Sequence, residues 1–180
     1  MEFKLTKIQG LIEIFPKLWG DARGIFFESF KKELFAENGI PLDFVQDNQS
    51  FSEKGVLRGL HMQHAPHEQG KLVRVITGKV LDVVVDIRKD SPTFGQHEKF
   101  VLDADRNNMV YVPPGFLHGF LTIEDAIFSY KCTDYYTKSA EGGVKFDDKT
   151  LGIDWGIANP KVSEKDMQLL SFEEFAKVLK

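Results

Sequence analysis

Short runs rich in Val, Ile, Phe and Tyr, separated by Gly, Pro, Asp and Asn, recur along this chain and constrain its fold more than any other feature. Such runs are typical of β-strands joined by turns. The chain lacks both a βαβ alternation and the GxGxxG and GxxxxGK[ST] motifs of nucleotide-binding α/β folds. The pattern therefore predicts an all-β sandwich, jelly roll or small barrel. The expected strands lie at Leu11–Phe15, Gly24–Phe27, Val56–His61, Lys71–Thr77, Lys79–Arg88, His97–Leu102, Asn108–Val112 and Ala126–Thr133.

The most apolar part of the chain runs from Lys71 to Arg88. It reads as two strands joined by a hairpin turn at Thr77-Gly78. The second arm, Val80 to Arg88, is too apolar for a strand with one face in water. We expect it to lie inside the sandwich or barrel.

Two short helical patterns complete the prediction of the fold. Residues Phe30–Phe35 are followed by Gly39, a suitable residue to end a helix. Ser171 and Glu174 have the spacing of a capping box, and an apolar stripe accompanies them at Phe172, Phe175 and Leu179. Both helices are expected at the periphery.

Length and composition indicate one globular domain spanning residues 1–180, because 42% of the residues are hydrophobic and 28% are charged. The single cysteine, Cys132, excludes an intrachain disulfide and suits a reducing cytosol. The first residues carry charges and form no signal peptide, and no stretch has the length of a membrane helix. We expect a cytoplasmic protein that does not bind membranes.

The formal net charge of −4 argues against a protein that binds nucleic acid through its phosphates. A small anionic ligand stays possible, because a local group of basic residues can bind it inside an acidic protein. Arg58, His61 and Lys71 are polar residues set into apolar strand sequence. Burying them costs free energy unless partners or a ligand satisfy them, so they indicate a central cavity.

Two alternatives complicate this interpretation. Arg58 and Lys71 can instead cap strand ends at the surface, where most charged residues lie. Arg58 and His61 also differ in strand parity, so both face one cavity only if a bulge or bend intervenes.

Two histidines lie in motifs that resemble those of the cupin superfamily. Pro113-Pro-Gly-Phe-Leu-His118 is a rigid turn that presents His118 at a strand start, and its P-x-G-x-x-H pattern is similar to the second cupin motif. Gly55 and His61 resemble the start of the first motif. The resemblance implies a jelly-roll fold.

The metal-ligand set of those motifs is degraded here. The second histidine of the first motif is replaced by Gln63, and Lys71 stands at the position of the acidic ligand. A protonated lysine repels a cation. Only His61, His118 and the allowed Glu68 remain, so we expect no bound metal.

Tyr130 lies in a strand pattern with Phe128 and Cys132 on the same face. A phenol in apolar surroundings needs a hydrogen-bond partner, and it can also donate a proton. A core tyrosine with its hydroxyl at the rim is the alternative.

Taken together, an ordered set of motifs from about residue 10 to residue 170 resembles the dTDP-4-dehydrorhamnose 3,5-epimerase family, a metal-independent branch of the cupins. The motifs are DARGIFFE, FVQDNQS, GVLRGLHMQ, QGKLVRVITGKVLDVVVDIR, SPTFG, PPGFLHGF, YKCTDYY and LGIDW. A single one of them would be weak, whereas the ordered set is specific.

The resemblance implies an isomerase that acts on a dTDP-linked 4-keto-6-deoxyhexose and inverts C3 and C5 beside the ketone. It implies His61 as the base, Asp166 as the partner that orients it, Lys71 at the ketone oxygen and Tyr130 as the opposed proton donor. Histidine suits this role because its pKa lies near neutral pH. No cofactor is expected, since no net electrons move.

The resemblance also implies substrate-binding positions and a homodimer whose N-terminal segments, bearing Arg23 and Glu28, reach across to the partner's site. Guanidinium groups suit the diphosphate and amides suit thymine. The implied binding residues are Arg23, Glu28, Gln46, Asn48, Arg58, His118, Glu141 and Lys165. For Glu141 and Lys165 the local sequence alone favours solvated charges.

Three other functions stay open from the sequence. A metal-dependent cupin isomerase or dioxygenase would need bound transition metal, which the missing second histidine disfavours. A non-catalytic cupin that binds sugar nucleotides would not need a base, its orienting partner and an opposed acid. An epimerase that inverts only C3 or only C5 differs in the shape of its pocket, which no motif encodes.

Overall fold

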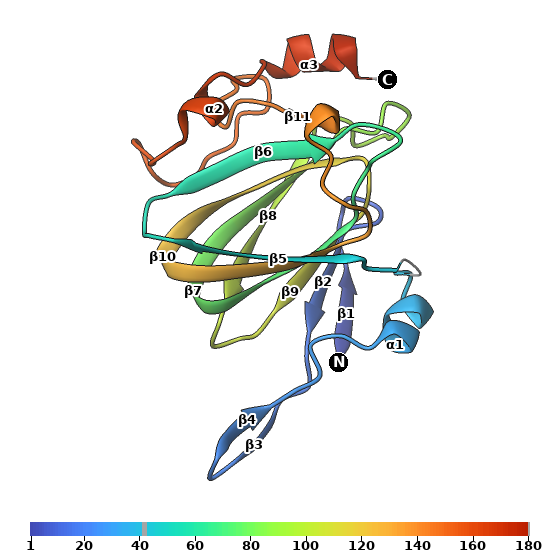
Figure 1. The fold of residues 1–180 in the computed structure, drawn as a ribbon, viewed down its shortest axis with the longest axis vertical. Helices are drawn as coiled ribbons and strands as arrows, with labels where there is room; N and C mark the ends of the chain where they lie inside the picture. Colours follow the sequence, from blue (N-terminus) through green and yellow to red (C-terminus); the bar gives the residue numbers. More distant parts are fainter. Residues whose placement is uncertain (41–42, 180) are drawn as a thin grey trace.

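A folded antiparallel β-sandwich forms the body of the protein (Figure 1). The structure is a computed structural model and describes residues 1–40 and 43–179. The strands are β1 Glu2–Leu5, β2 Ile12–Phe15, β3 Trp19–Asp21, β4 Gly24–Phe26, β5 Gln46–Ser52, β6 Leu57–Gln63, β7 Lys71–Asp86, β8 His97–Asp103, β9 Met109–Val112, β10 Phe116–Cys132 and β11 Glu141–Gly143. The helices are α1 Lys32–Glu37, the 3-10 turn η1 Lys138–Ala140, α2 Glu164–Met167 and α3 Phe172–Val178. The expected all-β jelly-roll class with few peripheral helices is confirmed.

Two long strands, β7 and β10, belong to both layers of the sandwich. The first half of β7 pairs with β9 and its second half pairs with β8. The first half of β10 pairs with β6 and its second half pairs with β5. Because β7 and β10 pair with each other along their length, the two layers are joined by continuous strands.

The predicted hairpin at Thr77-Gly78 is wrong, because β7 continues through this point as one strand. Gly78 has φ +75° and lies against the bend of β10, where the register shifts between Glu124 and Ile127. A glycine with positive φ is common to tight turns and to strand bends, so the local sequence does not separate the two. Here it lets β7 pass from one layer to the other.

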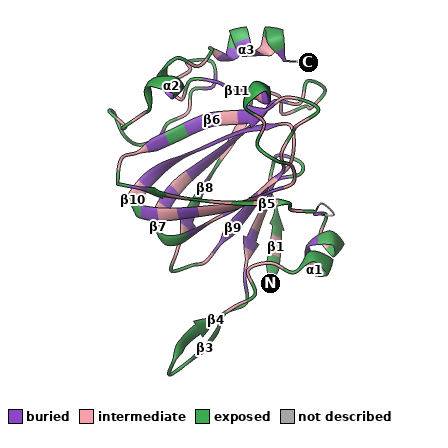
Figure 2. Ribbon diagram, viewed as in Figure 1, coloured by how far each residue is buried: buried purple, intermediate pink, exposed green. Residues whose placement is uncertain are grey.

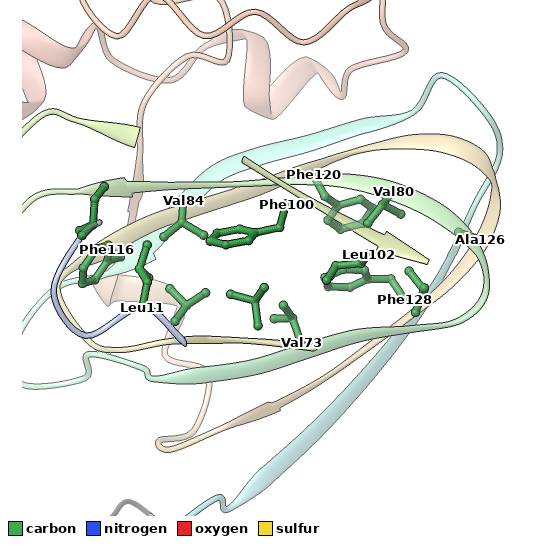
Figure 3. Close-up of a cluster of buried hydrophobic side chains, with 14 residues drawn as sticks. Leu11, Val73, Val80, Val84, Phe100, Leu102, Phe116, Phe120, Ala126 and Phe128 are labelled. Atoms are coloured by element: carbon green, nitrogen blue, oxygen red, sulfur yellow. The ribbon is translucent and has the colours of Figure 1, made fainter. Parts of the chain in front are cut away.

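The core lies between the two layers and contains side chains from both halves of β7 and β10 (Figure 3). Val80, Val84, Phe120 and Phe128 are buried there. Val83 and Val85 face the other side of the strand, where the C-terminal segment with Phe172 and Phe175 covers them. The expectation that Val80–Arg88 runs inside the molecule is therefore confirmed for its strand portion (Figure 2).

The C-terminal capping box is also present, since the Ser171 hydroxyl accepts a bond from the backbone N–H of Glu174 and the Glu174 carboxylate accepts one from the backbone N–H of Ser171. The first predicted helix forms at α1, and Gly39 follows its C-cap with φ +87°. No helix among residues 1–40 and 43–179 is long and apolar enough to cross a membrane.

We expect Gly78→Ala to destabilise the protein by about 3 kcal/mol, because the new Cβ would lie 2.1 Å from the carbonyl oxygen of Asp125. Gly39→Ala is the matched control. It has a similar φ but no heavy atom within 4 Å of its added Cβ, and should lose only about 1 kcal/mol. Urea unfolding of both variants measures the difference, and equal losses would contradict the role of Gly78 in the bend.

Candidate functional site

A cavity of about 620 Å³ opens between the layers of the sandwich and the C-terminal segment. Strands β5, β6, β7 and β10 form its walls, and the residues before and within α2 form its rim. The charged and hydrogen-bonding side chains that line it are Ser50, Arg58, His61, Lys71, His118, Tyr130, Lys161, Ser163, Lys165 and Asp166. The structure thus brings seven of the sequence-predicted residues to one cavity.

A bulge in β6 allows Arg58 and His61 to line the same cavity despite their opposite parity. His61 pairs with His118 and Arg58 pairs with Phe120, so β6 has one residue more than β10 between the two pairs. Gly59 lies within this bulge, and a Cβ there would meet the Cα of Gly119 at 2.6 Å. The bulge that the sequence required is present.

His61 and Asp166 form a short hydrogen bond, with 2.7 Å between Nε2 and Oδ1. The other oxygen of Asp166 accepts a bond from the backbone N–H of Gly59. Burial raises the pKa of Asp166, but the bonds from His61, Gly59 and Ser163 outweigh burial and leave the pKa below its usual value. Asp166 is therefore an anion that fixes the imidazole and leaves Nδ1 as the ring nitrogen available to a ligand.

Lys71 is the first residue of β7, and its side chain lines the cavity. Burial lowers its pKa, opposed by Cys132 and by the carboxylates of Asp82 and Glu141. No carboxylate of the described residues lies within ion-pair distance of its ammonium group. A buried cation without a close partner is costly for stability and suits a site that stabilises negative charge.

Tyr130 lies on β10 beside Phe128, with ring centroids 5.9 Å apart. Burial raises its pKa, and the nearby Cys132 adds to this effect. The phenol therefore keeps its proton at neutral pH, as a proton donor must.

His118 and Asp82 form a second carboxylate–imidazole pair, with 2.7 Å between Nε2 and Oδ2. Both side chains are buried, and the ring of His118 stacks on Phe128. The second oxygen of Asp82 has no hydrogen-bond partner among the described residues. Asp82 is not among the residues predicted from the sequence, although a carboxylate inside the apolar run VLDVVVD is a usable signal.

A smaller cavity of about 150 Å³ shares His61, Lys71 and Tyr130 with the larger one. Gln46, Asn48 and Glu141, three more of the predicted binding residues, line it. Glu141 accepts bonds from Lys165, at 2.6 Å, and from the hydroxyl of Tyr136, at 2.9 Å. Lys165 and Glu141 are therefore paired with each other rather than solvated separately.

Arg23 and Glu28 do not line either cavity of their own chain. Arg23 lies in the β3–β4 hairpin, which projects away from the sandwich, and it pairs with Asp21 (Figure 1). The Arg23 side chain is 90% exposed. The structure of a single chain thus leaves two of the predicted binding residues away from the rest.

The histidines of the two cupin-like motifs are each bound to a carboxylate of their own. Within the described part of the chain, no group of three or more His, Cys, Asp or Glu side chains is placed to hold a metal ion. Gln63 is buried and engaged in hydrogen bonds to backbone groups. These residues do not fit the metal set of the metal-binding cupins.

Comparison with known proteins places this arrangement in a family. The family model described as dTDP-4-dehydrorhamnose 3,5-epimerase matches residues 5–174. The dTDP-4-dehydrorhamnose 3,5-epimerase of Shigella flexneri is 48% identical over 164 residues, which cover 90% of this chain and 91% of that protein.

Two solved structures are similar along nearly the whole chain. The 3,5-epimerase of Legionella pneumophila, in complex with dTDP-4-keto-L-rhamnose, has a TM-score of 0.92 and 43% identity, covering 99% of this chain and 94% of that one. A 3'-monoepimerase from Streptomyces bikiniensis, in complex with dTDP-quinovose, has a TM-score of 0.90 and 34% identity, covering 97% of this chain and 90% of that one. The chain described here belongs to the dTDP-4-dehydrorhamnose 3,5-epimerase family.

Proposed function

We propose that this protein is an isomerase that inverts C3 and C5 of dTDP-4-dehydro-6-deoxy-D-glucose to give dTDP-4-dehydro-L-rhamnose. One observation carries the proposal: an imidazole held by a carboxylate, an ammonium group and a phenol line a single cavity. Membership of the family and the keto-sugar bound to the Legionella relative support the choice of substrate.

His61 removes the proton. C3 and C5 both flank the C4 ketone, so their protons are acidic enough for a general base of near-neutral pKa. Nε2 of His61 is bonded to Asp166, and Nδ1 therefore takes the proton. The Asp166 carboxylate stabilises the imidazolium that forms, as in hydrolase triads.

Lys71 stabilises the enolate. Its ammonium group lies deep in the cavity, where a fixed charge acts more strongly than in water. Negative charge develops on the C4 oxygen only as the proton leaves. The attraction to Lys71 is therefore stronger in the transition state than in the bound substrate, and this difference lowers the barrier.

Tyr130 returns a proton from the opposite face of the sugar ring and so inverts the centre. Its raised pKa keeps the phenol protonated until the carbanion forms. The reaction moves protons only, with no net electron transfer, so we propose that it requires no redox cofactor. We also propose that Lys71, rather than a metal ion, stabilises the enolate.

Basic side chains at the cavity rim suit the diphosphate of the substrate. Lys165 lies at the rim and Arg58 in the adjoining wall, in a chain of net charge −4. Gln46 and Asn48 supply amide groups for the thymine, and Glu141 and His118 complete the binding set.

We propose that the protein acts as a homodimer in which Arg23 and Glu28 complete the partner's site. The β3–β4 hairpin extends from the sandwich and exposes Ile25 and Phe26, an arrangement typical of a segment that packs on another chain. We also propose a cytoplasmic location, which the free thiol of Cys132 supports.

The function is tested by incubation with dTDP-4-keto-6-deoxyglucose in deuterated water. NMR and mass spectrometry should find deuterium at both C3 and C5, and His61→Ala should lower the exchange rate about 10³-fold while nucleotide affinity is kept. Tyr130→Phe should still exchange protons but yield little inverted sugar. Deuterium at only one carbon would mean that the protein inverts a single centre. Deuterium at neither carbon would mean that the protein binds the sugar nucleotide without catalysing epimerisation.

Lys71→Met should abolish the activity and yet stabilise the fold by about 1 kcal/mol, because it removes a buried charge without a close partner. Arg88→Met is the contrasting control. It leaves the buried carboxylate of Asp86 without its guanidinium and should cost about 2 kcal/mol. Urea unfolding compares the two variants, and a loss of stability for Lys71→Met as large as that of Arg88→Met would show that the ammonium group is structural.

Complementation tests the shared site. Arg23→Ala and His61→Ala chains should each be inactive alone. In a mixed dimer, the site that retains His61 receives an intact Arg23 from the other chain, so co-expression should restore about a quarter of wild-type activity. Sedimentation should give twice the 20.5 kDa mass of one chain. A monomer, or mixed chains without any recovered activity, would contradict the proposal.

A further inference from the structure

Gln63 occupies the last position of β6, where the metal-binding cupin motif has its second histidine. Its side chain is buried and uses both ends of the amide. Nε2 donates to the carbonyl oxygens of His67, at 2.7 Å, and Tyr135, at 3.1 Å. Oε1 accepts from the backbone N–H of Thr137 at 2.6 Å. A buried amide bonded in this way holds chain segments in place.

Gln63 bonds to the backbone on both sides of Tyr136. The carbonyl of Tyr135 and the N–H of Thr137 are bound by Gln63, and the N–H of Tyr136 itself donates to Oε1 of Gln46 at 3.0 Å. Two glutamine side chains therefore fix the backbone of Tyr136 at three points. Tyr136 is exposed, and its side chain is held by the bond from its hydroxyl to Glu141.

The backbone of β6 holds the other end of the same loop. Gln63 pairs with Glu141 of β11, and the N–H of His64 donates to the carbonyl of Ala140 at 2.7 Å. Gln63 and the adjacent His64 thus hold both ends of the loop from Tyr135 to Glu141.

This loop forms one wall of the smaller cavity. Tyr136 and Glu141 line it together with His61, Lys71 and Tyr130 of the proposed catalytic group, and the Tyr136 hydroxyl donates to Glu141. Glu141 also binds Lys165, which precedes Asp166 in α2. A shift of the loop would therefore alter the binding wall without removing any catalytic side chain.

We propose that Gln63 is a positioning residue that sets substrate affinity by fixing the loop Tyr135–Glu141 against the cavity. The inference rests on the proposed function. A glutamine is suited to the position because its amide supplies two donors and an acceptor on one plane, whereas a neutral imidazole offers one donor and one acceptor. Apolar replacement would remove all three of these bonds to the backbone of His67, Tyr135 and Thr137.

The test compares Gln63→Leu, Gln63→Glu and wild type in steady-state epimerisation and in dTDP binding by calorimetry. For Gln63→Leu we expect KM and the dTDP Kd to rise about tenfold while kcat stays within about threefold. Gln63→Glu keeps the size and the acceptor but loses the donors, so its KM should also rise at neutral pH and recover toward low pH as the carboxyl gains a proton. Gln96→Leu, at an exposed position away from the cavities, is the matched control and should behave as wild type.

Wild-type KM and Kd in Gln63→Glu, or a loss of kcat at unchanged KM, would overturn the proposal. Gln63→Glu decides the matter if the leucine variant fails to fold, because it changes only the amide nitrogen. Failure of the proposed function gives a different result, since wild type itself would then show no proton exchange in deuterated water, whatever its affinity for dTDP.

Discussion

The hydrogen bond between His61 and Asp166 joins parts of the chain that lie 105 residues apart, and the site depends on it. Asp166 reaches His61 only because the C-terminal segment packs on the outer face of β7 and β10 through Phe172 and Phe175. The bulge of β6 turns His61 toward the cavity, and the backbone of Gly59 in that bulge binds the same carboxylate. The packing that covers an apolar sheet face thus also orients the base.

The cavity holds charges that a stable core would avoid. Lys71 lines the cavity, and the buried Asp82, which is bonded to the cavity residue His118, keeps one oxygen without a partner among the described residues. Such groups cost stability unless a ligand satisfies them. Two features offset this cost: the strands that run through both layers, and the packed core around Phe120 and Phe128. The cavity can therefore hold polar side chains without the loss of the fold.

The sequence predicted most of the strands because apolar residues alternate or run together where sheets are buried, as in Val80–Arg88. It missed β5 because this strand has the polar sequence QDNQSFS. It placed a hairpin at Gly78 because glycine occurs both in tight turns and at bends within a strand, and both can require the positive φ seen here. The four residues proposed for catalysis lie at one cavity as expected, but their assembly depends on long-range packing that no local pattern contains. Arg23 and Glu28 do not line that cavity in their own chain, and only the family resemblance, which implies that they reach a partner's site, addressed their position.

The most direct test of the proposed chemistry is a crystal structure of the His61→Ala variant with bound dTDP-4-keto-6-deoxyglucose. We expect the C4 oxygen within hydrogen-bond distance of Lys71 Nζ, with the space vacated by the imidazole and the hydroxyl of Tyr130 on opposite faces of the sugar ring. A sugar bound outside this cavity, or with position 61 and Tyr130 on the same face, would contradict the mechanism.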